Sequence, residues 1–534
     1  MKNILLVLIA LMVLPYRVVS QSDTIRWSGD TVTIDSDYYL PDTTLLIIDP
    51  GVTVCFTGWY KIYGSGRIEA TGTETDSIKF TVKDTTGYAN EYQTKGGWHG
   101  IRLTDRAGND TTHFKYCIFE YGKAYDTAFL SFDRAGGAFY SANYNNIVFE
   151  NCTFRKNFAK LRGAAIHVYN STGLLNVLNC NFFHNVTRHD EGGAGVFSEQ
   201  TNTIIKNNLF YRDEAWYCDT SYIIDDTTHD TLAIVLGFAG DGAAVTVITY
   251  PHNDYLAIVA DNRIYNCKSH AGVIYSSSKH FKLINNLVVN CEGYAFWDGY
   301  GWYSEAQIVN NTFVNNDAIR EPEGGVWSIS HSDNYVIRNN IIYGNMCGLG
   351  PFQISPHLPA EYNCIQDGYP GEGNTSSEPR FANPTPGAGL DYDGMSADWT
   401  LLDNSPCVNS GTPDTAGLGL PPVDLNGNPR VYGNRVDMGA YENQSVWVKV
   451  NNAPLAETIK VYPNPGKEKI KVSLPPQTSD ALFDLINSEG KVLFHSALHY
   501  DYSEIYPLGL PPGIYFYRIY TPGKLLKQGK WIKR

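Results

Sequence analysis

The sequence of 534 residues is poor in charge and contains no helical period. Only 18% of its residues are charged, the formal net charge is −14, and no run is rich in Lys or Arg. A duplex nucleic acid is therefore not an expected partner. Beyond Ser20, no apolar stretch is long enough to cross a bilayer as a helix. Gly (49 residues), Tyr (37 residues) and an aromatic content of 13% instead favour strands and turns.

The N-terminal segment, from Met1 to Ser20, predicts a signal peptide. Met1-Lys2-Asn3 is a basic start, residues 4–14 form a short apolar core, and Val18-Val19-Ser20 offers a small-residue cleavage site. Because no cysteine lies near this site, a lipid-anchored lipoprotein is not expected. The chain is therefore expected to be exported.

A four-residue phrase recurs seven times between Asn151 and Asn345 and predicts a β-solenoid. The second residues of the copies are Cys152, Cys180, Asn208, Asn262, Asn286, Asn311 and Asn340. Their numbers increase in steps of 28, 28, 54, 24, 25 and 29, and we interpret the step of 54 as two turns of 27, one of them disguised. Short strands closed by Asn-rich corners at this spacing are typical of the coils of a parallel β-helix.

The residues around each phrase explain how such coils would stack. The fourth residue of the phrase is apolar in every copy, and one coil cannot bury these side chains alone. Asn at successive corners can hydrogen-bond to the Asn above and below it, and it tolerates the left-handed backbone of a tight corner. Five residues beyond the second residue lie Asn157, Asn185, Asp213, Cys267, Cys291, Asn316 and Asn345.

The ten cysteines are interpreted mainly as core thiols. Those at repeat corners are predicted to be reduced and stacked rather than bridged. They are Cys152, Cys180, Cys267 and Cys291, with Cys117 and Cys364 in looser copies of the phrase. Outside the pattern lie Cys55, Cys218, Cys347 and Cys407, to which the sequence assigns no partners.

Two further patterns carry resemblances to known families. Residues 45–103, with Pro50-Gly51-Val52-Thr53-Val54 and Trp98-His99-Gly100-Ile101, resemble the first turns of secreted parallel β-helix proteins. A second repeated phrase, as in Gly136-Gly137-Ala138-Phe139 and Gly163-Ala164-Ala165-Ile166, resembles the repeats of polymorphic outer-membrane proteins when it is paired with Phe-x-x-Asn. Many of those bacterial surface β-helices are adhesins, so this resemblance implies a fold and leaves the ligand open.

Residues 211–256 interrupt the rhythm. They contain an acidic group, Asp219, Asp225, Asp226 and Asp230, followed by an apolar run from Leu232 to Phe238. We expect a disguised coil plus a protruding loop. Insertions of this kind in solenoids usually map to one face, often the binding face.

Residues 378–442, called the closing segment below, resemble the ending of the choice-of-anchor Q family of surface β-helix proteins. The resemblance rests on Ser405-Pro406-Cys407-Val408-Asn409-Ser410-Gly411 and Val436-Asp437-Met438-Gly439-Ala440-Tyr441-Glu442. It implies that this segment closes the helix before an anchoring module. Asp424, Asn426 and Asn428 alternate as calcium ligands would, although a structural turn with Arg430 paired to Asp437 or Glu442 is favoured. No other cofactor is expected.

The C-terminal part of the chain, residues 458–534, resembles the type A sorting domain of the type IX secretion system. The resemblance rests on Tyr462-Pro463-Asn464-Pro465, on Gly490-Lys491-Val492-Leu493, and on Gly513-Ile514-Tyr515 before a Lys-rich end. It implies export across the outer membrane, removal of the domain, and release or attachment at the cell surface. The secretion machinery is then a partner.

These patterns predict an all-β chain. It comprises a signal peptide at 1–20, a right-handed parallel β-helix at 23–442 including the closing segment, a linker at 443–457, and a β-sandwich sorting domain at 458–534.

Two classes of function stay open. The first is a non-catalytic secreted or surface protein that binds glycan or a neighbouring surface, as adhesins do. The second is a polysaccharide lyase or glycoside hydrolase acting on the outer face of the helix. The sequence contains neither the Asn-Thr-Asp, Asp-Asp, Gly-His-Gly and Arg-Ile-Lys series of polygalacturonases nor the Trp-Ile-Asp-His signature of pectate lyases. The fold alone does not decide between the two classes. The absence of these catalytic signatures favours binding.

An aromatic stripe is the candidate glycan contact. If side chains after each Gly-Gly-Ala corner point outward, they form a surface suited to stacking on sugar rings. Phe197 is nevertheless expected to fill the core, and His167 and His331, taken singly, are expected to be surface residues. The candidate contacts are His167, Tyr169, Tyr275, Trp297, Asp298, Trp327 and His331.

Overall fold

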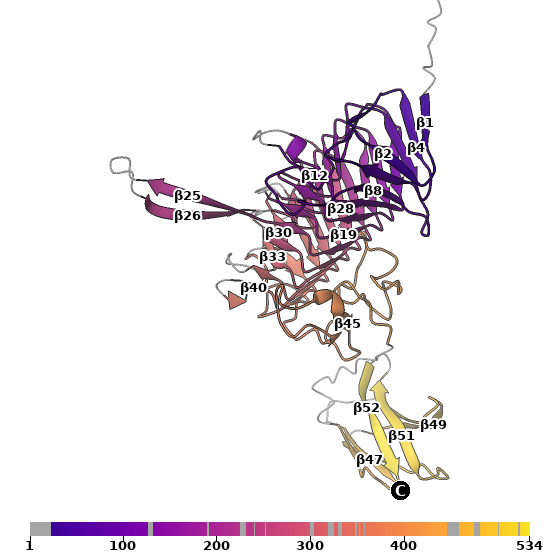
Figure 1. The fold of residues 1–534 in the computed structure, drawn as a ribbon. Helices are drawn as coiled ribbons and strands as arrows, with labels where there is room; N and C mark the ends of the chain where they lie inside the picture. Colours follow the sequence, from indigo (N-terminus) through magenta and orange to yellow (C-terminus); the bar gives the residue numbers. More distant parts are fainter. Residues whose placement is uncertain are drawn as a thin grey trace, which may run out of the picture. The chain divides into compact units, whose positions relative to one another are not determined.

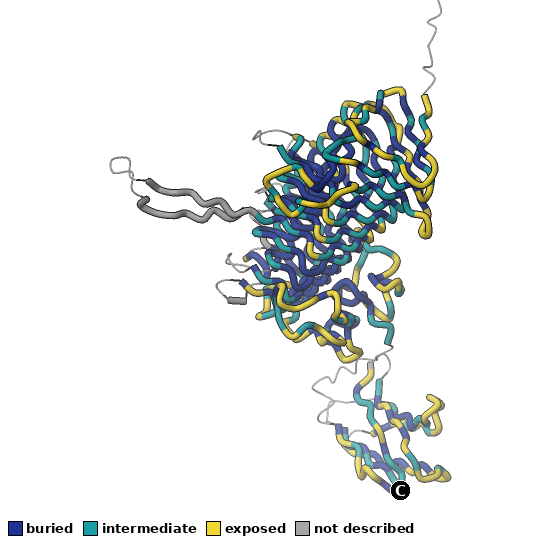
Figure 2. Tube along the Cα trace, viewed as in Figure 1, coloured by how far each residue is buried: buried dark blue, intermediate teal, exposed yellow. Residues whose placement is uncertain are grey.

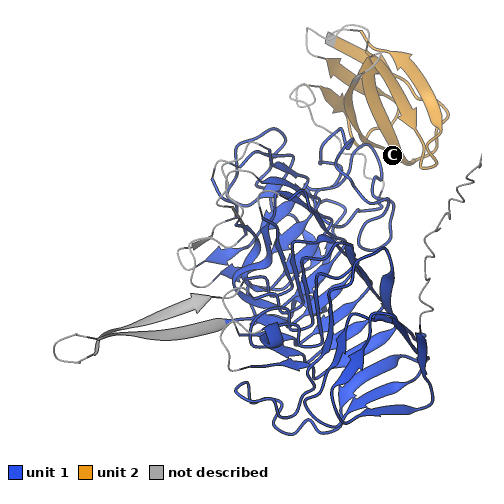
Figure 3. Cartoon of the chain, turned by 90° about the horizontal axis from the view of Figure 1, so that it is seen from above, with its two compact units in different colours: residues 1–445 blue, residues 446–534 orange. Residues whose placement is uncertain are grey.

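A computed structural model describes most of the chain after residue 22. The described residues are 23–126, 132–188, 192–224, 231–239, 241–250, 253–299, 304–318, 325–328, 334–347, 350–351, 353–356, 358–445, 459–474, 481–499, 501–521 and 524–534, without the side chains of 217–239, 327–328, 350–351, 501 and 524. The chain forms two compact units, Met1–Ser445 and Val446–Arg534 (Figure 3). The predicted signal peptide lies outside the described residues.

Three sheets of almost entirely parallel strands form the walls of the first unit, and every described coil except the last adds strands to all three (Figure 1). Within the described residues there is no α-helix, and the predicted parallel β-helix is confirmed. The twelve described strands of the first sheet are β1 (Asp23–Trp27), β4 (Thr44–Ile48), β7 (Arg67–Thr71), β10 (Thr111–Lys115), β14 (Asn146–Glu150), β18 (Leu174–Leu178), β22 (Asn202–Lys206), β28 (Leu256–Ala260), β31 (His280–Ile284), β34 (Glu305–Val309), β38 (Val336–Arg338) and β42 (Ala360–Glu361).

The second sheet again has one strand per coil. Its twelve described strands are β2 (Thr31–Ile34), β5 (Thr53–Phe56), β8 (Ile78–Val82), β11 (Cys117–Glu120), β15 (Thr153–Arg155), β19 (Asn181–Phe183), β23 (Leu209–Tyr211), β29 (Arg263–Tyr265), β32 (Leu287–Val289), β35 (Thr312–Val314), β39 (Ile341–Tyr343) and β43 (Cys364–Ile365).

The third sheet often takes two short strands from one coil. Its seventeen described strands are β3 (Tyr38–Leu40), β6 (Ile62–Gly64), β9 (Ile101–Thr104), β12 (Lys123–Ala124), β13 (Phe139–Ala142), β16 (Phe158–Ala159), β17 (Ile166–Tyr169), β20 (Val186–Thr187), β21 (Val196–Glu199), β24 (Glu214–Ala215), β27 (Val245–Ile248), β30 (Lys268–Ser277), β33 (Glu292–Asp298), β36 (Asp317–Ala318), β37 (Val326–Ser328), β40 (Met346–Cys347) and β41 (Gly350–Pro351).

Most residues on the strands of the coils are buried or half-buried (Figure 2). Stacked apolar side chains fill the interior of the coils. Five phenylalanines of the second sheet form one column with successive ring centroids 4.5–5.0 Å apart. They are Phe80, Phe119, Phe154, Phe182 and Phe210. The spacing follows the 4.7–4.9 Å separation of neighbouring strands, so each coil buries its rings against the next.

The two Asn functions predicted for the corners fall on different residues of the phrase. The first residue takes the left-handed backbone, with φ of 53° at Asn151 and 62° at Asn207. The second residue points inward and forms the ladder. From Asn208 through Asn262, Asn286, Asn311 and Asn340 to Asn363, each backbone N–H and side-chain amide donates to the next side-chain oxygen at 2.8–3.0 Å.

The interpretation of the step of 54 as two turns is wrong. β22 pairs directly with β28, and β23 with β29, so Asn208 and Asn262 lie on adjacent coils. The extra residues form one insertion containing the antiparallel strands β25 (Tyr217–Ile224) and β26 (Thr231–Ala239), which pair with each other. The insertion leaves the ladder intact because it lies between β24 and β27. The side chains of the acidic group and the apolar run lie outside the described residues.

The prediction of reduced cysteines is confirmed for Cys117, Cys152, Cys180, Cys267 and Cys291, which are free and buried. The other described cysteines form no disulfide in this structure, and the backbone N–H of Cys152 donates to the sulfur of Cys180 at 3.4 Å. The Cys218 side chain is outside the described residues.

The closing segment packs over the outer face of the second sheet on the later coils. Its short elements are β44 (Phe381–Asn383), β45 (Asp398–Leu401) and the 3-10 helix η2 (Gly394–Ser396). Trp399 and Met438 form an apolar cluster with outward side chains of β32, β35 and β39. The left-handed Asn of these coils binds the segment as well: Asn285 accepts from Arg430 at 2.9 Å, and Asn310 donates to the Asp437 carbonyl at 2.8 Å.

The second unit is a small β-sandwich. One sheet contains β46 (Lys460–Tyr462), β47 (Ile470–Leu474) and β50 (Asp501–Ile505). The other contains β49 (Val492–Ala497), β48 (Leu482–Ile486), β51 (Gly513–Thr521) and β52 (Lys524–Lys533). Their strands are antiparallel and enclose one core with Val472, Phe483 and Trp531.

Candidate functional site

A single column of side chains runs along the outer face of the third sheet, in register from coil to coil. Its neighbours in the chain, such as Ile62, Ile101 and Val196, lie in the core, so the alternation of a strand turns the column outward. In order, the outer column contains Tyr39, Tyr63, Arg102, Tyr140, His167, Phe197, Thr246, Tyr275 and Trp297, and the backbone register continues to residue 327.

The middle of this outer column is covered. The loop before each strand passes so close that a Cβ on Gly193 would lie 2.6 Å from the Phe197 ring, and one on Gly163 would lie 2.6 Å from the Cβ of His167. His167 and Phe197 are both fully buried, with ring centroids 4.9 Å apart. Arg162 lies over the Phe197 ring at 5.1 Å.

One expectation about this middle part is therefore wrong, namely that His167 is a surface residue. Phe197 is fully buried, as expected, although it lies outside the main core cluster and under a loop. His167 is buried rather than a surface histidine, and burial, followed by the charges of Arg162 and Arg102, lowers its pKa well below the usual value. Neither ring nitrogen of His167 has a hydrogen-bond partner among the described residues.

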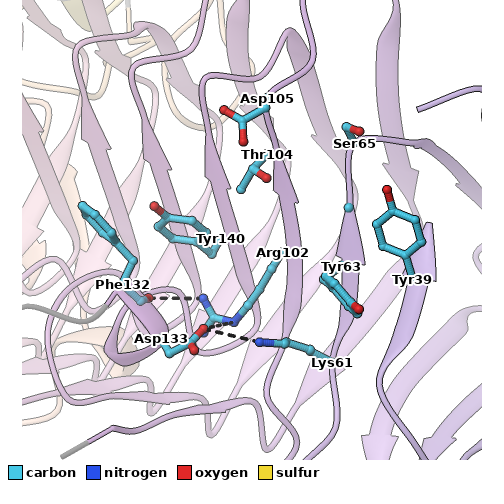
Figure 4. Close-up of a pocket in the computed structure, with 11 residues that line it drawn as sticks. Tyr39, Lys61, Tyr63, Ser65, Arg102, Thr104, Asp105, Phe132, Asp133 and Tyr140 are labelled. Carbon is cyan, nitrogen blue, oxygen red and sulfur yellow. Dashed lines mark hydrogen bonds and ion pairs between the residues drawn. The ribbon is translucent and has the colours of Figure 1, made fainter. Parts of the chain in front are cut away.

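The column opens into a groove on the first coils. The groove encloses about 370 Å³. Figure 4 shows Tyr39 and Tyr63 on one side and Tyr140 and Phe132 on the other, with Arg102 between them. The 3-10 helix η1 (Phe132–Arg134) supplies Phe132, which is 51% exposed, and Tyr39 is 57% exposed. The Tyr39 and Tyr63 ring centroids lie 5.3 Å apart.

The charged groups of the groove satisfy one another. Arg102 donates to the carbonyls of His99, Phe132 and Ala135 at 3.0, 3.3 and 2.9 Å. The Asp133 carboxylate lies 3.7 Å from Arg102 and 3.7 Å from Lys61. Burial lowers the pKa of Arg102 to about 10, against the opposing effect of Asp133, so the side chain stays a cation at neutral pH. The lining contains two cations, Lys61 and Arg102, and two carboxylates, Asp105 and Asp133.

The sequence-predicted contacts lie mainly on later coils. Tyr275 and Trp297 are neighbours in the outer column, half-buried, with ring centroids 6.2 Å apart. Asp298 is buried and accepts a hydrogen bond from the Tyr335 hydroxyl. Tyr169 is half-buried and stacks on Phe132 at 6.1 Å, which joins it to the groove. The Trp327 side chain and all of His331 lie outside the described residues.

Tyr39, Tyr63 and Arg102 were missed because the first coils lack the Asn phrase. A signal was present: in each case one outward residue stands beside an aliphatic core residue, as in Tyr39-Leu40, Ile62-Tyr63 and Ile101-Arg102.

The predicted calcium loop is held by its own hydrogen bonds. Asp424 accepts from the backbone N–H groups of Asn426, Asn428 and Glu442 at 2.9, 2.8 and 2.8 Å. Arg430 forms an ion pair with Glu442 at 2.8 Å, which is one of the two expected pairings. This arrangement explains the turn without an ion, and calcium binding there stays a prediction. Within the described residues, no group of three or more His, Cys, Asp or Glu side chains is placed to hold a metal.

Two family models match the chain. Residues 164–365 match the family described as right handed beta helix region, and residues 460–534 match the secretion system C-terminal sorting domain. No curated protein matches the chain. The resemblance of the closing segment to the choice-of-anchor Q family stays a prediction.

Fold and matches together define a right-handed parallel β-helix protein that carries a sorting domain of the type IX secretion system. The sorting domain indicates secretion to the outer membrane and cell surface, and the secretion machinery as a partner. In the part of the chain that is described, no helix has the length and apolarity to span a membrane.

Proposed function

We propose that this secreted or surface protein binds glycan without catalysis, and that the groove on its first coils is a main contact. The observation that carries the proposal is the outer column, which ends in the exposed rings of Tyr39 and Tyr63 facing Phe132 across the groove. Exposed aromatic rings beside a few polar groups suit stacking on sugar rings.

The charges of the groove favour a neutral glycan. Arg102 is committed to three carbonyls and Asp133, so it is poorly placed to neutralise a carboxylate on a ligand. The two cations and two carboxylates of the lining cancel formally. An anionic polysaccharide would gain little electrostatic attraction here, and the chain as a whole is acidic, with a net charge of −14.

Replacing Tyr63 by Ala is expected to weaken glycan binding about tenfold, which corresponds to about 1.4 kcal/mol. The physical reason is the loss of one stacking ring from the side of the groove that Tyr39 and Tyr63 form. A glycan array should first identify the ligand, and titration calorimetry of the secreted protein should then give the affinity of each variant.

Tyr92→Ala is the matched control. Tyr92 is 76% exposed and does not line the groove, so its removal should leave the affinity unchanged. Equal losses from the two substitutions, or no loss from Tyr63→Ala, would place the ligand elsewhere, with Tyr275 and Trp297 the next surface to change.

The enzyme hypothesis is tested on the same samples. A lyase needs a base beside a group that neutralises a uronate. His167 and Arg102 are the corresponding residue types in the outer column, but His167 is fully buried. Reducing-end and 235-nm product assays on the polysaccharides that bind should remain at background. Measurable turnover would contradict the proposal and identify the protein as an enzyme.

Export is expected to remove both ends of the chain. The sorting domain would be cut off after about residue 457, and the signal peptide after about residue 20, because each serves transport only. Intact-mass measurement of the extracellular protein checks this. A mass that still includes Tyr462 to Arg534 would contradict removal of the sorting domain.

A further inference from the structure

The closing segment brings together two cysteines that are distant in the sequence, Cys364 and Cys407. Cys364 belongs to β43 on the last described coil, and Cys407 belongs to the closing segment. Both are 0% exposed, and both lie in the apolar cluster that joins the closing segment to the second sheet.

Backbone contacts place Cys407 over the outer face of the strand that carries Cys364. The N–H of Met438 donates to the carbonyl of Cys407 at 3.0 Å. The next residue, Gly439, lies on Ile341, since a Cβ there would be 2.7 Å from Ile341 Cδ1. Ile341 pairs in register with Cys364. Burial, followed by the neighbouring Cys364 thiol, raises the pKa of Cys407 well above its usual value.

This pair differs in geometry from the stacked cysteines of the corners. Cys152 and Cys180 occupy equivalent positions on adjacent coils, so their side chains point the same way. Neighbouring strands are about 4.8 Å apart, whereas the Cβ atoms of a disulfide are about 3.8 Å apart. Cys364 instead points out of the coil, because its chain neighbour Ile365 lies in the core, and Cys407 meets it from the covering segment. Facing side chains can approach to bonding distance without moving two strands together.

We propose that Cys364 and Cys407 form a disulfide in the exported protein and thereby tie the closing segment to the last coil. The oxidant is a disulfide donor of the extracytoplasmic space, such as a thiol–disulfide oxidoreductase. The thiolate of one cysteine attacks the donor disulfide, and the second thiolate displaces the donor from the mixed disulfide. Two protein thiols lose two protons and two electrons, and the donor disulfide becomes two thiols.

The bond forms while the closing segment is still folding. Only a thiolate attacks a disulfide, and complete burial with a raised pKa leaves little thiolate at Cys407 once the segment has packed. For the same reason the finished bond is shielded from reductants. The bond closes the loop from residue 364 to residue 407 and fixes the middle of the closing segment where it covers the helix.

The test is disulfide mapping of the full chain. Protein unfolded in denaturant with reductant is refolded either with oxidised and reduced glutathione or with reductant alone. Free thiols are then alkylated in denaturant, and the protein is digested without reduction. We expect a peptide linking Cys364 to Cys407 in the oxidised sample, and a mass about 2 Da lower before alkylation because two hydrogens are lost. Protein purified from culture medium should contain the same linked peptide.

Cys364→Ser and Cys407→Ser should each abolish the linked peptide, whereas Cys267→Ser should leave it in place. If a Ser variant fails to fold, the wild-type protein from culture medium decides alone. Complete alkylation of both cysteines in the secreted and the oxidised samples would overturn the proposal, as would a linked peptide that joins either cysteine to a different partner.

Discussion

Replacing Asn286 by Leu is expected to destabilise the β-helix by about 3–5 kcal/mol, because each buried polar group left unpaired costs about 1–3 kcal/mol. The Asn286 oxygen accepts from the backbone N–H and the side-chain amide of Asn262, at 3.0 and 2.9 Å. Its own amide donates to the Val259 carbonyl and to Asn311, at 2.9 and 3.0 Å. Leu has a similar size but no polar atom, so these groups lose their partner inside a closed wall.

Urea unfolding followed by circular dichroism measures the loss. Asn181→Leu is the matched control, since Asn181 lies in β19 beside the core residue Phe182 and is half-exposed. A change of about 0.5 kcal/mol or less is expected there. Comparable losses from the two substitutions would mean that the ladder adds nothing beyond the general effect of an Asn-to-Leu change.

Much of the fold could be predicted because the same Asn-containing corner recurs from coil to coil. Asn is a residue that combines tolerance of the left-handed corner with a side chain that both donates and accepts, so its spacing marks the coils from Asn151 onward. The prediction of two turns between Asn208 and Asn262 was wrong because length alone does not distinguish a second coil from an inserted hairpin. Only the pairing of β22 with β28 makes that distinction.

The outer column was predicted in part, for a related reason. Tyr275 and Trp297 follow recognisable corners, so their outward register could be inferred. The burial of His167 depends on the path of the loop that precedes its strand and contains Gly163. The spacing of a sequence repeat carries no information about the path of that loop. The first coils have no Asn phrase to align, so Tyr39 and Tyr63 became visible only through strand pairing.

The closing segment shows a second use of the corner Asn. On early coils such as those of Asn179 and Asn207, the outward Asn side chains bond to each other. On late coils the same position binds the covering segment, as Asn285 does with Arg430. One residue type in one register therefore serves both for stacking coils and for attaching the segment that covers them.

Stability of the β-helix is expected to fall as pH rises from about 4 to about 8, with Asp213 as one cause. Asp213 occupies the position five residues beyond the second residue of the phrase, where the two preceding coils have Asn157 and Asn185, and it is fully buried. One oxygen accepts from the backbone N–H and the side-chain amide of Asn185, at 2.8 and 2.9 Å, and the other has no hydrogen-bond partner among the described residues. Burial raises the pKa of Asp213 from 3.8 to about 8, against the opposing effect of these hydrogen bonds.

The direction of this pH dependence follows from the number of protons that the folded and unfolded states bind. Between about pH 4 and about pH 8 the folded state holds a proton on Asp213 that the unfolded state has lost, so folding becomes less favourable by about 1.4 kcal/mol for each pH unit. Below pH 4 both states are protonated and the contribution is constant. Above pH 8 both are ionised, and the full penalty of about 4–6 kcal/mol applies.

Asp213→Asn should remove this dependence, because the amide keeps an oxygen for Asn185 and carries no charge at any pH. The variant and the wild type should have similar stability near pH 4, and the variant should be more stable by about 4–6 kcal/mol above pH 8. Urea unfolding at pH 4, 6 and 8.5 gives the difference curve, which cancels the contributions of other carboxyls with a raised pKa, such as Asp437 and Glu442. The exposed Asp30→Asn is the control and should give a flat difference. If the stability difference between Asp213→Asn and the wild type also stayed constant with pH, Asp213 would be ionised in the folded protein at neutral pH. Its charge would then be stabilised by a group other than Asn185.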